Sequence, residues 1–264
     1  MPPANVKSYR DEIARRHRRV FIFKIIAIVA GTVAVVVALI YFLFFSRIFD
    51  VREVSFSGLD TVNSDEFRGK INDKLNQKIL KFLPRRNNIF LVNTRNFEAE
   101  FATAYPILSS VKVQKKLLHG LIFNFSERKP AGIWCFKESC SYFDDNKILW
   151  GQPAKSSGFI FLTVEDRRIK SSWQIDDKFF KPIMEVAKNM AGEVNNIVIP
   201  EGSFNEFRAY TAHGYYIIFS TDSDIKNQLD IFKIFLAEKK DSLPAGGFHP
   251  QYIDLRIEGR IYYK

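Results

Sequence analysis

An uninterrupted apolar stretch near the N-terminus, from Ile25 to Phe45, constrains the architecture of this chain more than any other feature. It contains no charged residue, and about 20 apolar residues in a helix suffice to cross a hydrocarbon core roughly 30 Å thick. A helix of a soluble protein rarely lacks a polar face. The sequence therefore predicts a transmembrane helix at residues 25–45.

The charges on either side of this stretch predict its orientation. Residues 1–24 carry seven basic and two acidic side chains, whereas Arg47 and Arg52 beyond it are balanced by Asp50 and Glu53. Cytoplasmic flanks of membrane helices carry an excess of Lys and Arg. We therefore expect a cytoplasmic tail at residues 1–24 and a single-pass, type II protein of the cell (inner) membrane, with most of the chain outside the cytoplasm.

A cleaved signal peptide is the alternative for the same stretch. Its apolar core would span about 7–15 residues and end in a small-residue cleavage site. Here the apolar run is longer and ends in YFLFFSR, without an A-x-A pattern. An uncleaved anchor is the favoured interpretation.

The formal net charge of +10 raises the question of a nucleic-acid partner. The basic tail supplies half of this charge, and the rest is spread along the exported part. Nucleic-acid binding calls for a clustered basic patch within a recognisable module, and the sequence shows neither. We expect no nucleic-acid partner, and the mildly basic exported part is compatible with anionic lipids or wall polymers.

The two cysteines, Cys135 and Cys140, lie in WCFKESCSYF, where residues 137–139 are typical of a tight turn. Opposed positions of a hairpin can come within disulfide range, and an oxidising compartment permits the bond. The alternative is a pair of free thiols in a partly buried strand. A zinc site is disfavoured because no second ligand pair lies nearby.

The exported part is rich in aromatic residues, which make up 15% of the whole chain. Alternating apolar and polar residues indicate strands, and apolar residues at every fourth position indicate helices. On these criteria Phe49–Phe56 is expected to be a strand, and Phe67, Ile71 and Leu75 predict the apolar stripe of a helix. Residues 49–127 as a whole have the expected order strand, helix, helix, strand, strand. Residues 130–264 alternate hairpins with two helices, so the expected fold class is α+β.

No constellation of residues points to catalysis. The chain lacks an H-E-x-x-H pair, a G-x-S-x-G elbow and a phosphate-binding G-x-x-x-x-G-K-[ST] loop. The paired carboxylates at 144–145 and 176–177 are interpreted as turn and helix-cap residues, and the C-x-x-x-x-C spacing does not match a thioredoxin-like C-x-x-C site. We expect no enzyme activity, no cofactor, no metal site and no small-molecule substrate.

The chain ends in two expected strands, Tyr252–Ile257 and Arg260–Tyr263. A last strand with no successor leaves one sheet edge unpaired unless a neighbour covers it, and such an edge can accept a strand from a partner. The alternative is that the terminal strand is an inner or protected strand, and the pattern alone does not decide. The candidate partner-binding residues are Arg256, Ile257, Glu258, Gly259, Arg260, Ile261 and Tyr262.

Several short motifs, taken in their order, resemble the FtsQ/DivIB family of bacterial cell-division proteins. They are FDVREVSFSGL after the anchor, the run from Tyr105 to Val113, ERKPAGIW at residues 127–134, the turn from Asp144 to Trp150, and YIDLR at residues 252–256. Gly132 stands where the family usually has Ala, and Lys147 where Gly is common. The loop Lys78–Asn88 is longer than expected for the family, so no contact is carried over to it.

The resemblance implies a POTRA (polypeptide-transport-associated) domain at residues 49–127. It implies an FtsQ-type C-terminal β domain at residues 128–264, a mixed α/β domain with a largely antiparallel sheet. It further implies a scaffold at the division septum that binds FtsB-like and FtsL-like single-pass proteins, the former through the C-terminal strand region, and helps to control septal peptidoglycan synthesis.

The alternative is another POTRA-bearing protein, a secretion or envelope-assembly factor. Such proteins usually feed a C-terminal β-barrel with strands of about 9–11 residues and an apolar lipid-facing side. This chain is too short for that arrangement and carries an anchor instead.

Overall fold

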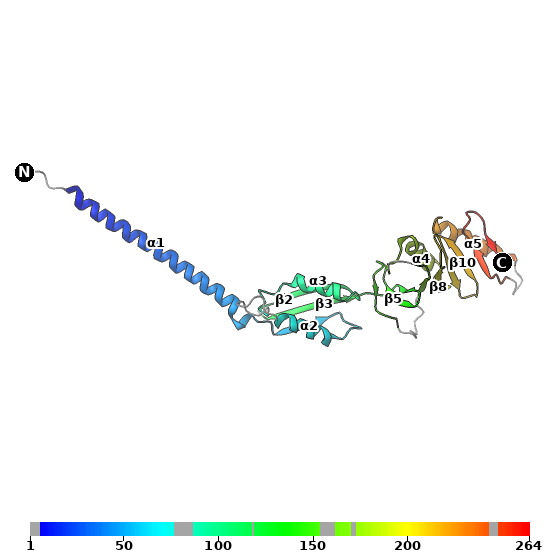
Figure 1. Cartoon of the computed structure of the whole chain (residues 1–264), viewed down its shortest axis with the longest axis horizontal. Coiled ribbons are helices and arrows are strands. Elements are labelled where there is room, and N and C mark those ends of the chain that lie inside the picture. The colour runs from blue at the N-terminus through cyan, green and yellow to red at the C-terminus, as the bar shows by residue number, and fades with distance from the viewer. Residues whose placement is uncertain (1–5, 77–86, 118, 154–161, 170–172, 243–247) are drawn as a thin grey trace, which may run out of the picture. The chain divides into compact units, whose positions relative to one another are not determined.

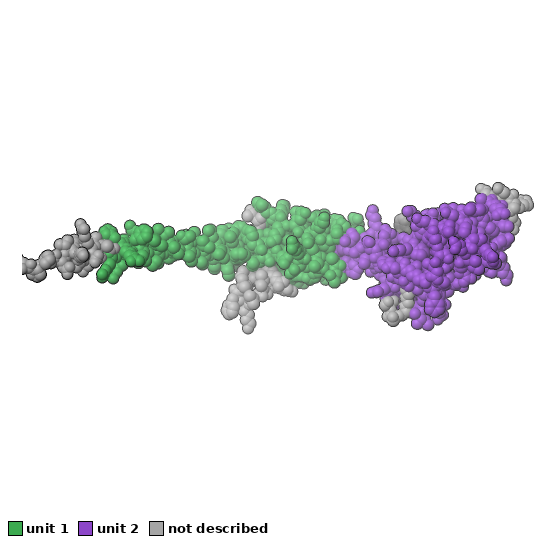
Figure 2. Space-filling model, turned by 90° about the horizontal axis from the view of Figure 1, so that it is seen from above, with its two compact units in different colours: residues 1–104, 110–127 green, residues 105–109, 128–264 purple. Residues whose placement is uncertain are grey.

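The computed structural model describes residues 6–76, 87–117, 119–153, 162–169, 173–242 and 248–264. The chain divides into two compact units: unit 1 comprises residues 1–104 and 110–127, and unit 2 comprises residues 105–109 and 128–264 (Figure 2). Unit 1 begins with helix α1, Val6–Phe45, whose part from Arg15 to Phe45 is long and apolar enough to cross a membrane (Figure 1). The helix also includes much of the basic tail.

The rest of unit 1 contains a short 3-10 helix, η1 (Arg47–Phe49), followed by strands and helices in the expected order. These are β1 (Glu53–Ser57), α2 (Ser64–Asn76), α3 (Thr94–Ala104), β2 (Leu108–Lys116) and β3 (Gly120–Glu127). The strands form a three-stranded sheet in the order β1-β3-β2, with β1 parallel to β3. The first strand is shorter than the expected Phe49–Phe56, because its first residues belong to η1 and an extended connection.

Phenylalanine side chains from both helices and from β3 form the core of unit 1. Phe67 of α2 lies 5.4 Å from Phe101 of α3 and 5.0 Å from Phe125 of β3, measured between ring centroids. Phe97 meets Phe123 edge-on at 5.8 Å. These rings are buried, as are Ile71 and Leu75, so the apolar stripe predicted for α2 is the packed face of that helix.

The end of β3 is tied to the loop that precedes α2. The Glu127 carboxylate accepts hydrogen bonds from the backbone N–H groups of Asp60, Thr61 and Val62, and from the Thr61 hydroxyl. Burial would raise the Glu127 pKa, but these bonds outweigh it and leave the pKa below its ordinary value. The charged carboxylate therefore organises a loop that has no regular structure of its own.

Unit 2 is built on a nine-stranded sheet in the order β12-β11-β10-β9-β8-β7-β4-β5-β6. Three neighbouring pairs are parallel (β4 with β7, β7 with β8, β10 with β11) and five are antiparallel, so the sheet is mixed. The strands are β4 (Gly132–Phe136), β5 (Ser139–Phe143), β6 (Leu149–Trp150), β7 (Leu162–Asp166), β8 (Val194–Ile199), β9 (Glu206–Thr211), β10 (Tyr216–Ser220), β11 (Tyr252–Asp254) and β12 (Tyr262–Tyr263).

Two helices supply the other half of the unit 2 core. Helix α4 (Asp177–Asn189) begins after Asp176, whose carboxylate accepts from the Lys178 N–H as an N-cap. Helix α5 (Ile225–Ser242) packs beside β10, and α4 packs beside both α5 and β8 (Figure 1). The buried core joins side chains of α4 and α5 to one side of the sheet, including Trp134, Phe179, Ile197, Phe207, Phe219, Leu229 and Ile253.

The end of the chain differs from the sequence-based expectation. Strand β11 ends at Asp254 instead of Ile257, and β12 contains two residues instead of four. Residues 255–261 form a loop with a turn at Glu258–Gly259, where Gly259 has φ 71°, a conformation that glycine adopts without steric cost. The expected strand Tyr252–Ile257 is too long because the turn at Glu258–Gly259 interrupts the pairing.

Candidate functional site

The C-terminal strand β12 lies at one end of the nine-stranded sheet and β6 at the other. Tyr262 and Tyr263 pair with Asp254 and Ile253 of β11, and among the described residues no strand pairs with their other side. The Lys264 N–H donates to the Tyr252 carbonyl, and successive peptide groups of a strand point to opposite sides. The Tyr263 N–H therefore faces the outer side of the strand, where another strand could pair.

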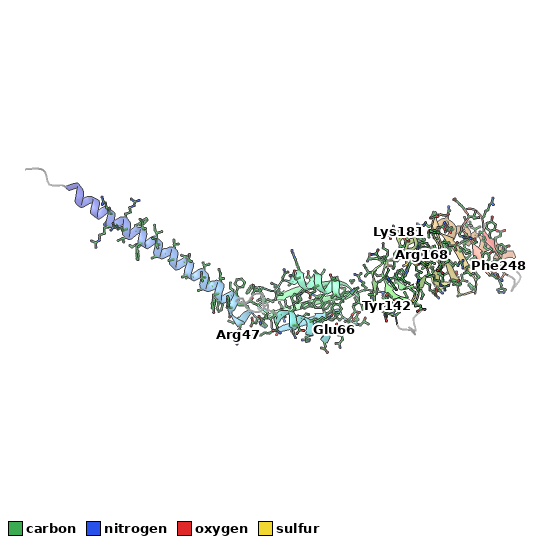
Figure 3. All side chains as sticks on the ribbon, viewed as in Figure 1. Arg47, Glu66, Tyr142, Arg168, Lys181 and Phe248 are labelled. Carbon is green, nitrogen blue, oxygen red and sulfur yellow. A yellow bond between two sulfur atoms is a disulfide. The ribbon has the colours of Figure 1, made fainter. Side chains whose placement is uncertain are left out.

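The two tyrosines of β12 face opposite sides of the sheet. Tyr263 shares the side of buried Ile253, and its ring lies 5.4 Å from each of Phe235 on α5 and Phe248. Phe248 is labelled in Figure 3. Tyr262 points to the other side with 46% of its surface exposed. Tyr263 is itself 48% exposed, so its ring contacts tie the strand to its own unit without burying the ring, while Tyr262 lies on the other side of the sheet.

Arg256 connects the start of the C-terminal loop to two strands. Its guanidinium donates to both carboxylate oxygens of Asp254 in β11, and to the carboxylate of Glu206 in β9. The hydrogen bonds from Arg256 keep the Asp254 pKa below its ordinary value, although burial acts in the opposite direction. The hydrogen bond to Asp254 raises the Arg256 pKa. Burial lowers this pKa, but its effect is smaller. The three side chains form a charged cluster that includes Arg256, the first residue of the candidate segment.

The remaining candidate residues lie mainly in the loop between β11 and β12. Ile257 is 52% exposed, Glu258 and Gly259 form the turn, and the Arg260 N–H closes it by donating to the Ile257 carbonyl at 3.1 Å. Ile261 is partly buried against the unit 2 core. Within the described part of the chain, the Glu258 and Arg260 side chains have no hydrogen bond or ion pair, so both are available to a partner.

A small surface hollow adjoins this loop. Leu255, Ile257, Glu258 and Arg260 line one side of it. The other side comes from the first two turns of α5 and the residues before them: Ser223, Asp224, Asn227, Gln228 and Ile231. The candidate segment therefore offers an apolar side chain, charged groups and a small recess in the loop that leads to β12.

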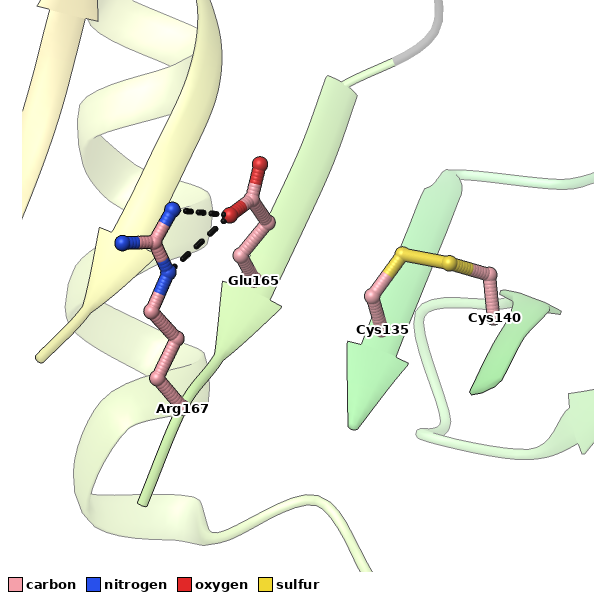
Figure 4. The surroundings of a disulfide bond; sticks show 4 residues. All are labelled: Cys135, Cys140, Glu165 and Arg167. Carbon is pink, nitrogen blue, oxygen red and sulfur yellow. Dashed lines mark hydrogen bonds and ion pairs between the residues drawn. A yellow bond between two sulfur atoms is a disulfide. The ribbon is translucent and has the colours of Figure 1, made fainter. Parts of the chain in front are cut away.

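Cys135 and Cys140 are joined by a disulfide between β4 and β5 (Figure 4). They occupy directly opposed positions in the hairpin register. On the neighbouring strand β7, Glu165 accepts hydrogen bonds from the guanidinium of Arg167, as Figure 4 also shows. The bridge closes the hairpin of β4 and β5, which lies near the β6 end of the sheet. Several strands separate this hairpin from the edge strand β12.

Among the residues that the structure describes, no group of three or more His, Cys, Asp and Glu side chains is arranged to hold a metal ion. Comparison of the sequence with models of known protein families gave no match, and comparison with curated proteins gave none. The geometry of the C-terminal edge is thus the main guide to function.

Sequence reasoning missed the residues that hold the C-terminal segment in place. Glu206 lies 50 positions before Arg256, and Phe235 lies on a helix whose register against β12 no local pattern reveals. A usable signal was present in YIDLR, because an Asp two residues before an Arg can form the pair that the structure shows between Asp254 and Arg256.

Proposed function

We propose that this protein is a membrane-anchored cell-division scaffold of the FtsQ/DivIB type. It binds FtsB-like and FtsL-like single-pass proteins at the septum through its C-terminal sheet edge and helps to control septal peptidoglycan synthesis. Helix α1 is the anchor, with the basic tail in the cytoplasm and the two units outside it. On this proposal unit 1 is the POTRA domain and contributes to recruitment.

The observation that carries the proposal is the position of β12. Strand β12 stands at the end of the sheet formed by the described residues, pairs there with β11 alone, and carries the exposed Tyr262. Strand addition at such an edge supplies main-chain hydrogen bonds for affinity and side-chain contacts for choice of partner. The order of elements in unit 1, with β1 parallel to β3, supports the POTRA assignment.

Membrane anchoring makes a short edge sufficient. A two-residue strand and one exposed ring offer a small interface, which by itself is typical of weak association. Partners that are also anchored in the same membrane are confined to the same surface, and their effective concentration is raised accordingly. A modest interface at β12 can then hold an assembly together.

The proposal is tested by co-purification of the full-length protein with FtsB-like single-pass proteins from the same cells, together with depletion. We expect capture of such a protein, and cells that fail to complete septa when the protein is depleted. Absence of capture combined with normal septation would overturn the proposal.

A further inference from the structure

The end of α1 is connected directly to a later segment of unit 1. Asn88, which is only 1% exposed, donates from its side-chain amide to the carbonyls of Leu43 and Phe44 at 2.9 and 3.2 Å. These carbonyls belong to the last turn of α1 and have no partner within the helix. The ring of Phe42 also meets that of Phe49 edge-on. The folded part of unit 1 thus begins where the apolar helix ends.

Three segments of unit 1 meet at this end. The Val51 N–H donates to the Asn87 carbonyl at 2.7 Å, and the Arg52 N–H donates to the His119 carbonyl at 2.9 Å. Residues 47–52, residues 87–91, and the pair Leu117 and His119 between β2 and β3 therefore lie next to one another beside the end of α1. We refer to these three segments as the helix-proximal end of unit 1.

Outside α1, the exposed large apolar side chains among the described residues of unit 1 lie at this end. Ile48 is 53%, Phe90 52% and Leu117 87% exposed. Between residues 46 and 127, these are the only large hydrophobic side chains found exposed in the described segments. The described residues of the opposite end, where Glu127 binds the loop at 60–62, include no exposed large apolar side chain. One apolar residue at a surface needs no explanation, but three from three separate segments at one end indicate an interaction surface.

Basic side chains accompany the apolar ones. Arg47 lies at the end of α1, as labelled in Figure 3, and Arg52 donates to the Arg47 carbonyl. Both arginines are exposed. Aromatic and aliphatic side chains at the acyl boundary, with arginines reaching toward phosphates, are the composition of interfacial membrane contacts.

We propose that the helix-proximal end of unit 1 is a second membrane-contacting surface, in which Ile48, Phe90 and Leu117 enter the headgroup region of the phospholipid bilayer crossed by α1. The occupant follows from continuity, since Ile48 comes three residues after the last residue of α1. The inference rests on the proposed anchoring role of α1. Its consequence is that unit 1 is held against the membrane surface by the fold as well as by the tether.

The experiment places nitroxide labels on the full-length protein in nanodiscs of zwitterionic and anionic phospholipid. Single cysteines are introduced as Leu117→Cys and Phe90→Cys, with Val33→Cys as a marker within α1 and Asp60→Cys as a matched exposed control at the opposite end of unit 1. The native cysteines are bridged and do not compete for the label, which labelling of the parent protein checks. Accessibility to oxygen is compared with accessibility to a water-soluble nickel chelate.

The expected result is a greater accessibility to oxygen than to nickel at residues 33, 90 and 117, and the reverse at residue 60. If residue 33 is within the bilayer but both 90 and 117 are fully accessible to nickel, the surface contact is refuted while the anchor stands. If residue 33 is itself in water, the anchor and the surface contact both fail. Leu117 is the more informative site, because its high exposure means that a label there disturbs little packing.

Discussion

Arg256, just after β11, donates a hydrogen bond to Glu206 at the start of β9, and so reaches across the intervening strand β10. The same guanidinium binds Asp254 through both carboxylate oxygens. A planar, forked donor suits this double contact better than the single ammonium of lysine. The hydrogen bonds from Arg256 to Asp254 and Glu206 set the path of the chain as it leaves β11 and enters the loop that leads to β12.

Replacement of this arginine tests whether the path matters for binding. We expect Arg256→Ala to lower the affinity for the FtsB-like partner about tenfold, which corresponds to about 1.4 kcal/mol. The free energy of unfolding should change by less than about 1 kcal/mol, because the pairs are partly exposed. Arg256→Lys is the matched control and should recover part of the affinity. If the parent, Arg256→Ala and Arg256→Lys bind the partner with equal affinity, the charged cluster does not contribute to binding.

The two tyrosines of β12 form an internal control for the edge itself. Tyr262→Ala should weaken partner binding about tenfold or more, as expected for a contact residue, and leave thermal unfolding unchanged. Tyr263→Ala should lower the free energy of unfolding by about 1 kcal/mol or more, because its ring packs against Phe235 and Phe248. Calorimetry for binding and for unfolding separates the two effects.

Ile257 tests the loop beside the edge in the same way. Ile257→Asp places a charge on an exposed apolar position and should weaken binding while the domain stays folded. If Ile257→Asp and Tyr262→Ala both bind as well as the parent, the edge is not the partner site.

Glu127 should stabilise unit 1 in a pH-dependent manner. Its pKa is below the ordinary value in the folded protein, so its contribution is fully present above pH 4.5 and is lost as pH falls through the lowered folded-state pKa. At neutral pH, Glu127→Gln should reduce the free energy of unfolding by about 1–2 kcal/mol. Amide hydrogen exchange at Asp60 and Val62 should become faster, and the variant should respond less to acid than the parent.

Glu53→Gln is a suitable control for that experiment. Glu53 makes an exposed ion pair with Lys116, and such pairs are worth between 0 and about 1 kcal/mol. If both variants exchange at the same rate as the parent, the carboxylate does not organise the 60–62 loop.

The disulfide should be present in the full-length protein purified from cells without reductant. Mass spectrometry without reductant should find Cys135 and Cys140 linked, and two free thiols would contradict this. Because the bridge closes a short loop, its removal in Cys135→Ala with Cys140→Ser should cost no more than about 2 kcal/mol. Binding at β12 should persist in this variant, since the bridge lies in β4 and β5.

Local patterns in the sequence were enough to predict the helices. The stripe of Phe67, Ile71 and Leu75 became the buried face of α2, and the carboxylate pair at 176–177 marks the start of α4. The apolar run at 25–45 lies within α1. The apolar positions and capping residues that specify these helices lie within a few residues of one another, so the local sequence is enough to predict them.

The arrangement of strands could not be predicted in the same way. Parallel pairing of β4 with β7 and of β10 with β11 joins segments separated by whole hairpins or helices, and no local spacing encodes it. The end of β11 was also misplaced, because the turn at Gly259 competes with the strand pattern. The contact from Asn88 to the end of α1 depends on the fold as a whole.

The most direct test of the proposed role is the position of the full-length protein in dividing cells, followed with a fluorescent protein fused to the cytoplasmic tail. We expect a band at the division site that depends on residues 49–264 and is retained when the disulfide is removed. Uniform fluorescence around the cell membrane throughout division, with the protein intact and anchored, would contradict it.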